Sequence, residues 1–373
     1  MKIDIGNRRD EGTLAGKILL VPFFEDEKQI NESYVDLFKN LQGIGFKGKK
    51  NEIRVTSIGN SWETICAIGL GKREKYNIDV LRTSLSSGFR EIQRSSFTQV
   101  DIEMPGVDDM EKEAMEIAYI AEITLYEFSK YKSGNEKKNL VEKIKVLGEK
   151  SIEKSVENGQ ILGKATNYAR DFANMPSSDG TPSFYESMAR SLKNVKVSVI
   201  EKEKFKELGM GGLEGVSRAA KEPAKLVIME YNNSTDRPFA MIGKGITFDS
   251  GGISIKPSSG MQDMKFDKCG ASAVLGAMKA LSEMEAKVNV IGLAPLTENL
   301  PGGNAYKPGD ILTHYNGKTS EVITTDAEGR LVMADALSYA VDKFKPKAIL
   351  DISTLTGACV TALGNNIAGL MGN

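Results

Sequence analysis

Short apolar runs alternate with amphipathic stretches along the first 150 residues. Lys17 to Phe24 and Thr64 to Leu70 are rich in aliphatic residues and have the length of strands. Residues 78–92 and 110–130 carry apolar side chains three and four positions apart, which predicts amphipathic helices. Three more apolar runs predict strands over 52–58, 100–104 and 140–147. We therefore predict that residues 1–150 form an N-terminal α/β domain.

One long helical pattern joins this part of the chain to the rest. Its apolar side chains fall on one face from residue 151 to 173, and the pattern ends before the loop Met175-Pro176-Ser177-Ser178-Asp179-Gly180. A helix that ends at a loop rich in Pro, Ser and Gly is typical of a connector between domains. We therefore assign residues 151–180 to a connecting helix and loop, and residues 181–373 to a second domain.

The second domain alternates strands and helices more regularly. The expected elements are strands over 225–231, 238–243, 288–293 and 348–353, helices over 270–284 and 330–344, and a hairpin around Gly317. The strands are apolar on both faces, which indicates an α/β fold with a mostly parallel central sheet covered by helices. Such sheets bind ligands in the loops at the carboxyl ends of their strands. Lys244, Asp249 and Asp326 are each expected just after a strand.

Composition narrows the class of protein. The chain has 49 Lys and Arg against 50 Asp and Glu, a net charge of -1, so no overall field favours nucleic acid or an anionic membrane. Its three scattered cysteines do not form the pattern of a disulfide framework or a zinc knuckle. The charged amino terminus lacks the apolar core of a secretory signal, and no apolar run approaches the roughly 18 residues that span a bilayer. We therefore expect a cytoplasmic protein without nucleic-acid or membrane partners.

Histidine is scarce, since His314 is the only one in the chain. Zinc sites of the His-Glu-x-x-His type need two histidines and are excluded. A Ser-His-Asp or Cys-His arrangement would have to use His314, which lies where a hairpin arm enters the Asn316-Gly317 turn. We expect a partly exposed strand histidine there rather than a catalytic one. Any metal would then be held by carboxylates, backbone carbonyls or lysine.

Four carboxylates stand at predicted turns between residues 241 and 331: Asp249, Asp267, Asp326 and Glu328. Taken singly, each is better explained as a carboxylate near the start of a helix or in a surface turn than as a metal ligand. Asp326 and Glu328, however, flank a single alanine, so both can reach one centre from the same loop. Converging carboxylates repel one another unless cations lie between them, and two divalent ions about 3.5 to 4 Å apart are a recurrent hydrolytic device. The joint pattern indicates a two-metal hydrolase.

These residues lie in segments that resemble the leucyl (cytosol) aminopeptidase family of zinc and manganese enzymes. Residues 243–252 (Gly-Lys-Gly-Ile-Thr-Phe-Asp-Ser-Gly-Gly) resemble its first motif and 267–271 (Asp-Lys-Cys-Gly-Ala) its second. Residues 324–331 (Thr-Thr-Asp-Ala-Glu-Gly-Arg-Leu) resemble its signature, and 354–358 (Thr-Leu-Thr-Gly-Ala) a further motif. The resemblance runs from about Asn174 to the end of the chain. The N-terminal region is similar to the family's macro-like domain in size and α/β pattern.

The resemblance implies two metal sites. Lys244, Asp249, Asp267 and Glu328 would hold the tighter ion, and Asp249, Asp326 and Glu328 the more exchangeable one. The ions would be Zn²⁺ or Mn²⁺, with Mg²⁺ or Co²⁺ as alternatives, and would supply a water nucleophile. A lysine ligand has to lose its proton, which neighbouring cations and exclusion from water favour.

The resemblance also implies the remaining roles. Lys256 would stay charged and polarise the scissile carbonyl or stabilise the oxyanion, and Arg330 would hold a bicarbonate that acts as general base. Met264, Thr354 and Gly357 match family positions that shape the pocket for the first side chain of the substrate. Two positions nearby depart from the family, because Thr324 replaces the usual Asn and Lys268 replaces a common Met.

We therefore expect a metal-dependent aminopeptidase that releases apolar N-terminal residues such as Leu from small peptides. The alternatives are an altered family member that binds DNA as a regulator, and a metallohydrolase of another amide or a phosphate ester. The resemblance implies a homo-hexamer. The family's catalytic domain continues beyond the length given, so we expect this one to be truncated at its C-terminal end.

Overall fold

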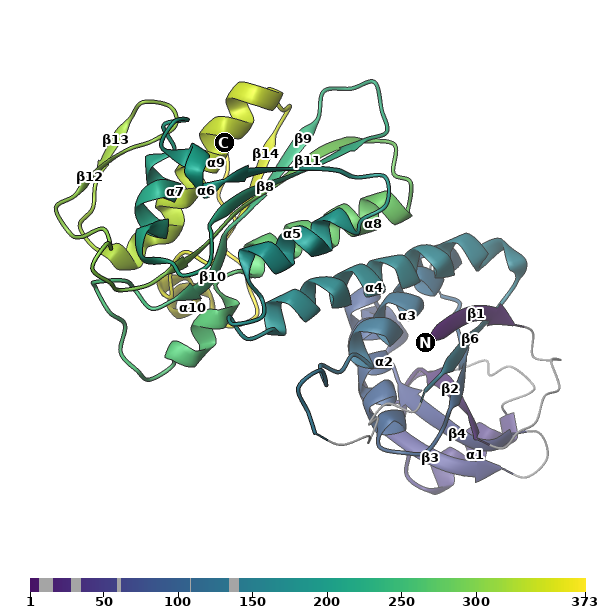
Figure 1. The fold of residues 1–373 in the computed structure, drawn as a ribbon. Helices are drawn as coiled ribbons and strands as arrows, with labels where there is room; N and C mark the ends of the chain where they lie inside the picture. The colour runs from purple at the N-terminus through teal and green to yellow at the C-terminus, as the bar shows by residue number, and fades with distance from the viewer. Residues whose placement is uncertain (7–15, 28–34, 59–61, 108, 134–140) are drawn as a thin grey trace. The chain divides into compact units, whose positions relative to one another are not determined.

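The computed structural model describes residues 1–373 apart from 7–15, 28–34, 59–61, 108 and 134–140. The chain forms two compact units, Met1–Asn167 and Tyr168–Asn373, which are described separately (Figure 1). Helix α4 (Glu153–Asn174) contributes to both units. Among the described residues, no helix has the length and apolar character that a membrane crossing requires.

The first unit is a six-stranded sheet in the order β1-β6-β5-β2-β4-β3. The pairings are parallel except for that of β3 with β4. The strands are β1 (Lys2–Gly6), β2 (Lys17–Phe23), β3 (Ile53–Ile58), β4 (Trp62–Gly69), β5 (Gln99–Glu103) and β6 (Lys143–Leu147). The helices are α1 (Val35–Gly43), α2 (Ile78–Gln93) and α3 (Met110–Thr124).

Strand β2 shows why helices cover both faces of this sheet. Its side chains alternate, so that Ile18 and Leu20 pack with the apolar residues of α2 and α3, whereas Leu19 and Val21 pack with α1. The predicted strands and helices of this unit are confirmed, although α3 ends at Thr124 rather than near residue 130. Strand β1 and helix α1 were not predicted from the sequence.

The second unit is built on a sheet in the order β14-β9-β11-β8-β7, with β10 paired to the far end of β11. The pairings of β14 with β9, β9 with β11, and β10 with β11 are parallel, and those of β8 are antiparallel. The strands are β7 (Lys196–Glu201), β8 (Lys225–Asn232), β9 (Phe239–Gly243), β10 (Gly245–Asp249), β11 (Asn289–Asn299) and β14 (Ile349–Ile352). The predicted α/β class with a mostly parallel sheet is confirmed.

Helices cover both faces of this sheet as well. Helices α6, α7 and α9 pack on one face, and α5 and α8 pack on the other (Figure 1). The helices are α5 (Pro182–Arg190), α6 (Lys202–Phe205), α7 (Gly211–Val216), α8 (Cys269–Glu283), α9 (Glu328–Phe344) and α10 (Ala358–Leu363). The central strand β11 is buried almost throughout, which explains its near-continuous apolar sequence.

Strands β9 and β10 run along the same neighbour, β11, and are separated only at Lys244. At this break the Lys244 N–H donates to Ile352 O at 3.0 Å, and Lys244 O accepts from the Ala271 N–H at 2.8 Å. The main chain of Lys244 is therefore held by β14 and by the first turn of α8. The sequence predicted the end of β9 but not the continuation in β10.

Candidate active site

Five elements deliver the predicted ligand side chains to one end of the second unit's sheet. Lys244 occupies the break between β9 and β10, and Asp249 is the last residue of β10. Asp267 follows a 3₁₀ turn that leads into α8, and Glu328 is the first residue of α9. The expectation that Asp326 directly follows a strand is wrong. It lies in a 3₁₀ turn before α9 whose start is capped by the Thr324 hydroxyl.

The carboxylates of Asp249, Asp326 and Glu328 converge, with one oxygen of each lying within 4.8 Å of the others. Two lysines lie among them. Lys244 Nζ is 2.7 Å from Asp267 Oδ2 and 2.7 Å from Glu328 Oε1. Lys256 Nζ is 2.9 Å from Asp249 Oδ2 and also contacts Asp326 Oδ1. The two ammonium groups neutralise negative charge at the positions where cations would bind.

Because these groups are buried, a charge that lost its partner here would be costly. Lys244, Asp267 and Glu328 are each less than 8% exposed. Burial, with a smaller contribution from the neighbouring Glu328, raises the pKa of Asp267 to about 7 against the opposing effect of Lys244. Asp267 Oδ2 is buried without an aligned hydrogen bond, although Lys244 lies within reach. A buried, under-satisfied carboxylate beside three others and a lysine is a donor set that suits a divalent cation, so the residues fit a metal.

Gly329 allows Lys244 to reach this position. A Cβ at residue 329 would lie 2.5 Å from Lys244 Cε and 2.7 Å from its Nζ. A side chain at residue 329 would displace the end of Lys244 from its present position, so glycine keeps the ammonium group between Asp267 and Glu328. The residue that follows Glu328 is therefore a glycine for a steric reason, because a Cβ at this position would meet Lys244.

Asn299 and Tyr306 orient the cluster, and the sequence analysis missed both. Asn299 Nδ2 donates to Asp249 Oδ1 at 2.8 Å and to Thr325 O at 2.9 Å. Tyr306 Oη donates to the same Thr325 carbonyl at 2.7 Å. Asn299 ends the buried central strand β11 beside the end of β10, and this position at the carboxyl end of a strand was the available signal.

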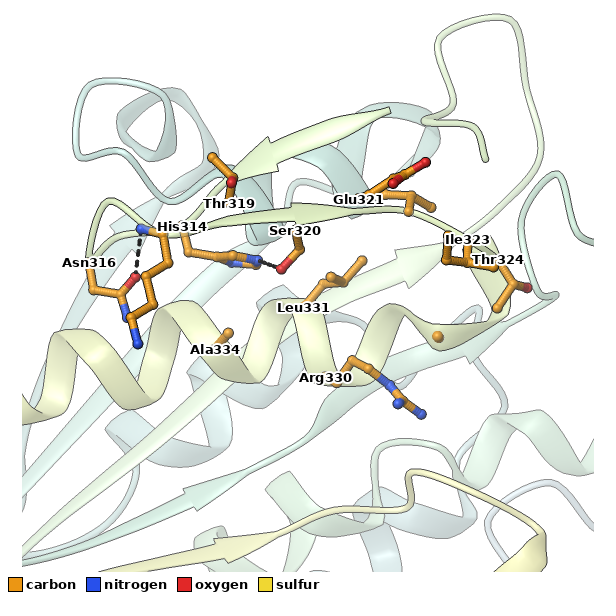
Figure 2. Close-up of a pocket in the computed structure, with 13 residues that line it drawn as sticks. His314, Asn316, Thr319, Ser320, Glu321, Ile323, Thr324, Arg330, Leu331 and Ala334 are labelled. Atoms are coloured by element: carbon orange, nitrogen blue, oxygen red, sulfur yellow. Dashed lines mark hydrogen bonds between the residues drawn. The ribbon is translucent and has the colours of Figure 1, made fainter. Parts of the chain in front are cut away.

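Lys256 lies at the cluster, and Arg330 follows the ligand candidate Glu328 by two residues in α9. Burial lowers the pKa of Lys256, but its hydrogen bonds to Asp326 and Asp249 outweigh burial and raise the pKa overall. Its ammonium group therefore stays charged at neutral pH. Arg330 is exposed in the first turn of α9, and its guanidinium points away from the hairpin formed by β12 (Ile311–Thr313) and β13 (Thr319–Glu321) (Figure 2). Lys256 is partly exposed and Arg330 is exposed, so solvent reaches both cations.

Two of the three predicted pocket residues, Met264 and Thr354, contact Asp267. The Thr354 hydroxyl donates to Asp267 Oδ1 at 2.8 Å, and Thr354 O accepts from Lys244 Nζ at 3.0 Å. Met264 O accepts from the Asp267 N–H at 3.3 Å. Gly357 is exposed, and a Cβ added there would meet nothing within 4 Å.

His314 differs from its predicted environment. It follows β12 (Ile311–Thr313) and precedes the turn into β13 (Thr319–Glu321), as the hairpin prediction required, but it is only 4% exposed. Its Nδ1 is 3.1 Å from Asp335 Oδ1 and its Nε2 is 2.9 Å from Ser320 Oγ (Figure 2). The prediction of a partly exposed histidine is wrong, because the ring lies between the hairpin and α9.

Lys268 is completely buried beside the cluster. Its Nζ donates to Met175 O at 3.0 Å and to Lys265 O, and it lies 5.6 Å from the centre of the Phe172 ring. Burial lowers the pKa of Lys268 from 10.5 to about 8. These two carbonyls supply hydrogen-bond acceptors for the ammonium group of Lys268, which therefore does not depend on Asp267 for a partner.

This depressed pKa predicts a pH-dependent stability. Between about pH 8 and pH 10 the unfolded chain retains the Lys268 proton and the folded chain loses it, so the metal-free protein should become more stable by on the order of 2 kcal/mol as pH rises. Lys268→Met should abolish this gain, whereas Lys265→Met should retain it. Urea unfolding of the three proteins in chelator measures the difference. Parallel pH curves for wild type and Lys268→Met would contradict the prediction.

Comparison with known proteins decides the family. The description "Cytosol aminopeptidase family, catalytic domain" matches residues 167–373, and the family's N-terminal domain matches residues 20–135. The chain belongs to the cytosol aminopeptidase family. It is therefore a hydrolase of the peptidase class, as the motifs around Asp249 and Asp326 predicted.

Individual relatives agree with this cytosol aminopeptidase assignment. A probable cytosol aminopeptidase of Cenarchaeum symbiosum is 39% identical over 91% of this chain and 70% of its own length. The cytosol aminopeptidase of Pseudomonas aeruginosa is 41% identical over 73% of this chain and 57% of its own length. Among solved structures, the bottromycin maturation enzyme BotP matches with a TM-score of 0.81 and 27% identity, over 94% of this chain and 74% of BotP. A second BotP structure is a complex with Mn.

Proposed function

We propose that this chain is a metal-dependent aminopeptidase that removes the N-terminal residue of small peptides and prefers apolar residues such as Leu. The observation that carries the proposal is the cluster of four carboxylates interleaved with Lys244 and Lys256. In a family of peptidases, such a cluster at the carboxyl ends of parallel strands is the natural place for hydrolysis. A homo-hexamer and a cytoplasmic location belong to the same proposal.

The cluster offers ligands for two divalent ions, Zn²⁺ or Mn²⁺ in the first place. Lys244, Asp249, Asp267 and Glu328 would hold one ion, and Asp249, Asp326 and Glu328 the other. The Mn complex of BotP supports this choice of metal class. When bound, such ions polarise the scissile carbonyl and lower the pKa of a water that attacks it.

Lys244 couples metal binding to proton release. Burial lowers its pKa, but Glu328 and Asp267 more than offset burial and raise it overall, so Lys244 is protonated in the metal-free chain. A ligand nitrogen needs a free electron pair, so this proton has to leave when a cation enters. The buried carboxylates that hold the ammonium group then become available to the metal.

Lys256 and Arg330 supply the remaining chemistry. Lys256 keeps its proton and lies beside Asp249 and Asp326, so its ammonium group can stabilise negative charge that develops on the substrate carbonyl oxygen. Arg330 presents an exposed guanidinium one turn into α9, where it would hold a bicarbonate that accepts the proton of the attacking water.

The apolar preference rests on the surroundings of the cluster. Ile253 and Ile255 precede Lys256 in the same loop and are 45% and 59% exposed, so they offer apolar surface to a substrate side chain. Met264 and Thr354 contact Asp267, and Gly357 follows Thr354 by three residues. A side chain such as that of Leu would lie between these groups.

A free N-terminal amine should be required for hydrolysis. The neutral α-amine of a peptide can bind a metal only at the chain end, so leucine p-nitroanilide should be cleaved about 10³-fold faster than its N-acetylated form in the presence of Mn²⁺. Release of p-nitroaniline measures both rates. A chelator-treated sample is the control and should cleave neither compound. Equal rates for the two substrates would indicate a hydrolase of other amides instead.

A further inference from the structure

A second polar arrangement shares none of the carboxylate ligands and has no role in the proposed peptidase. His314 lies between Asp335 of α9 and Ser320 of β13, with its Nδ1 3.1 Å from Asp335 Oδ1 and its Nε2 2.9 Å from Ser320 Oγ. The order carboxylate, imidazole, hydroxyl is that of a nucleophile activated by a general base.

The partners of Asp335 determine which ring nitrogen of His314 carries the proton. Asp335 Oδ1 accepts from the Tyr315 N–H at 3.0 Å, and Asp335 Oδ2 accepts from the Leu213 N–H at 2.9 Å. Both oxygens are therefore acceptors, so Nδ1 of His314 donates to Asp335. In the neutral ring Nε2 then carries the lone pair and accepts from the Ser320 hydroxyl. This is the tautomer that a base for Ser320 requires.

A cavity of about 530 Å³ gives small molecules access to this serine. Its wall includes His314 and Ser320, apolar groups from Ile323, Leu331 and Ala334, and the guanidinium-bearing residue Arg330. Figure 2 shows the hairpin above α9, with the Ser320 hydroxyl directed at the imidazole between them. Ser320 is half-buried, whereas His314 is almost fully buried, so a ligand reaches the hydroxyl while the base stays shielded from water.

We propose that Ser320 is a nucleophile that accepts acyl groups from small activated esters. His314 Nε2 takes the hydroxyl proton while Ser320 Oγ forms a bond to the ester carbonyl carbon. The bond from that carbon to the leaving oxygen then breaks, and His314 returns the proton to the departing alcohol. Water releases the acyl group as a carboxylic acid by the same path, which restores the serine.

The same hydrogen bonds also fasten the hairpin to α9 and α7, because Asp335 binds main-chain N–H groups of Tyr315 and Leu213. That structural role stabilises the fold but gives Ser320 no reactivity beyond that of other serines. Reactivity toward an electrophile therefore separates the two roles, whereas stability does not.

A fluorophosphonate is the probe, because the serine oxygen displaces fluoride from phosphorus and leaves a stable adduct. The full chain is incubated with it after chelator treatment, and the modified peptide is identified by mass spectrometry. We expect an adduct on Ser320 that is absent in Ser320→Ala. His314→Gln should slow labelling by at least about 10²-fold, since a general base contributes roughly 10² to 10⁴. Ser187→Ala is the matched control, because Ser187 is exposed and its hydroxyl binds only a carbonyl in the described contacts.

Three outcomes would overturn the proposal. One is a wild-type protein in which Ser320 carries no adduct, and another is equal labelling of wild type and His314→Gln. The third is labelling that the chelator abolishes, because it would assign the reaction to the metal centre. If His314→Gln unfolds, hydrolysis of p-nitrophenyl acetate by wild type and by Ser320→Ala tests the proposal instead. A burst of nitrophenol that occurs in wild type and is absent in Ser320→Ala supports it. Identical time courses refute it. Leucine p-nitroanilide hydrolysis should be unchanged in Ser320→Ala.

Discussion

Asp326→Ala is expected to lower kcat/KM for leucine p-nitroanilide by at least about 10³-fold, which corresponds to roughly 4 kcal/mol of transition-state stabilisation. Asp326 shares one proposed ion with Asp249 and Glu328, and it also contacts Lys256. Its loss would therefore weaken metal binding and leave the Lys256 ammonium group without one of its two anchors. The Asp326 side chain is 37% exposed, so the fold should tolerate its removal.

Metal content and stability make this prediction specific. Bound Mn²⁺ per chain, measured by elemental analysis after gel filtration, should fall in Asp326→Ala, while the urea midpoint of the chelated protein should change little. Asp236→Ala is the matched control, because Asp236 is an exposed aspartate of the same unit that pairs with Lys347. Hydrolysis at the wild-type rate by Asp326→Ala would refute the assignment of the site.

Lys244→Met is expected to destabilise the metal-free protein by about 3 to 5 kcal/mol, the usual effect of removing one partner from a buried ion pair. Lys244 is 2% exposed and lies 2.7 Å from both Asp267 and Glu328. Without the ammonium group, two buried carboxylates would face each other with no cation between them. Urea unfolding in chelator measures the loss.

Lys225→Met provides the contrast for this variant. Lys225 is also nearly buried and pairs with two carboxylates, but Glu186 and Glu201 are partly exposed and can be rehydrated. Its replacement should therefore cost only about 1 kcal/mol. Added Mn²⁺ should restore part of the stability of Lys244→Met, because cations replace the missing charge, and should not rescue Lys225→Met. Equal losses in the two variants would argue against a special charge balance at Lys244.

Acid should partly rescue Lys244→Met as well. The pKa of Asp267 is about 7 although Lys244 lowers it. Without Lys244, the pKa of Asp267 in the variant should therefore be higher than 7. A carboxyl group whose pKa is raised by folding stabilises the folded state below the unfolded pKa, and this contribution is lost as pH rises through the folded value. The metal-free variant should therefore lose stability as pH rises from about 4 to 7.

The helices and strands with a strong apolar periodicity were predictable, because the spacing of their apolar side chains reflects which of their faces are buried. Strand β11 reads as a continuous apolar run since both of its faces are covered, and α9 and α8 show helical spacing. Strand β10 was missed because it is short and follows β9 after a single residue, so no turn residue separates the two patterns. The interruption at Lys244 depends on hydrogen bonds to Ile352 and Ala271, which belong to distant segments.

The sequence by itself determined the family, the α/β class and the identities of the candidate ligands, because these depend on residue types in a fixed order. Only the tertiary structure decided which side chains meet. It placed Asn299 against Asp249, directed the buried ammonium group of Lys268 at the Met175 carbonyl, and enclosed His314 between Asp335 and Ser320. The physical reason is that burial and hydrogen bonding arise between segments remote in sequence, and a local pattern carries no record of the partner that arrives from elsewhere.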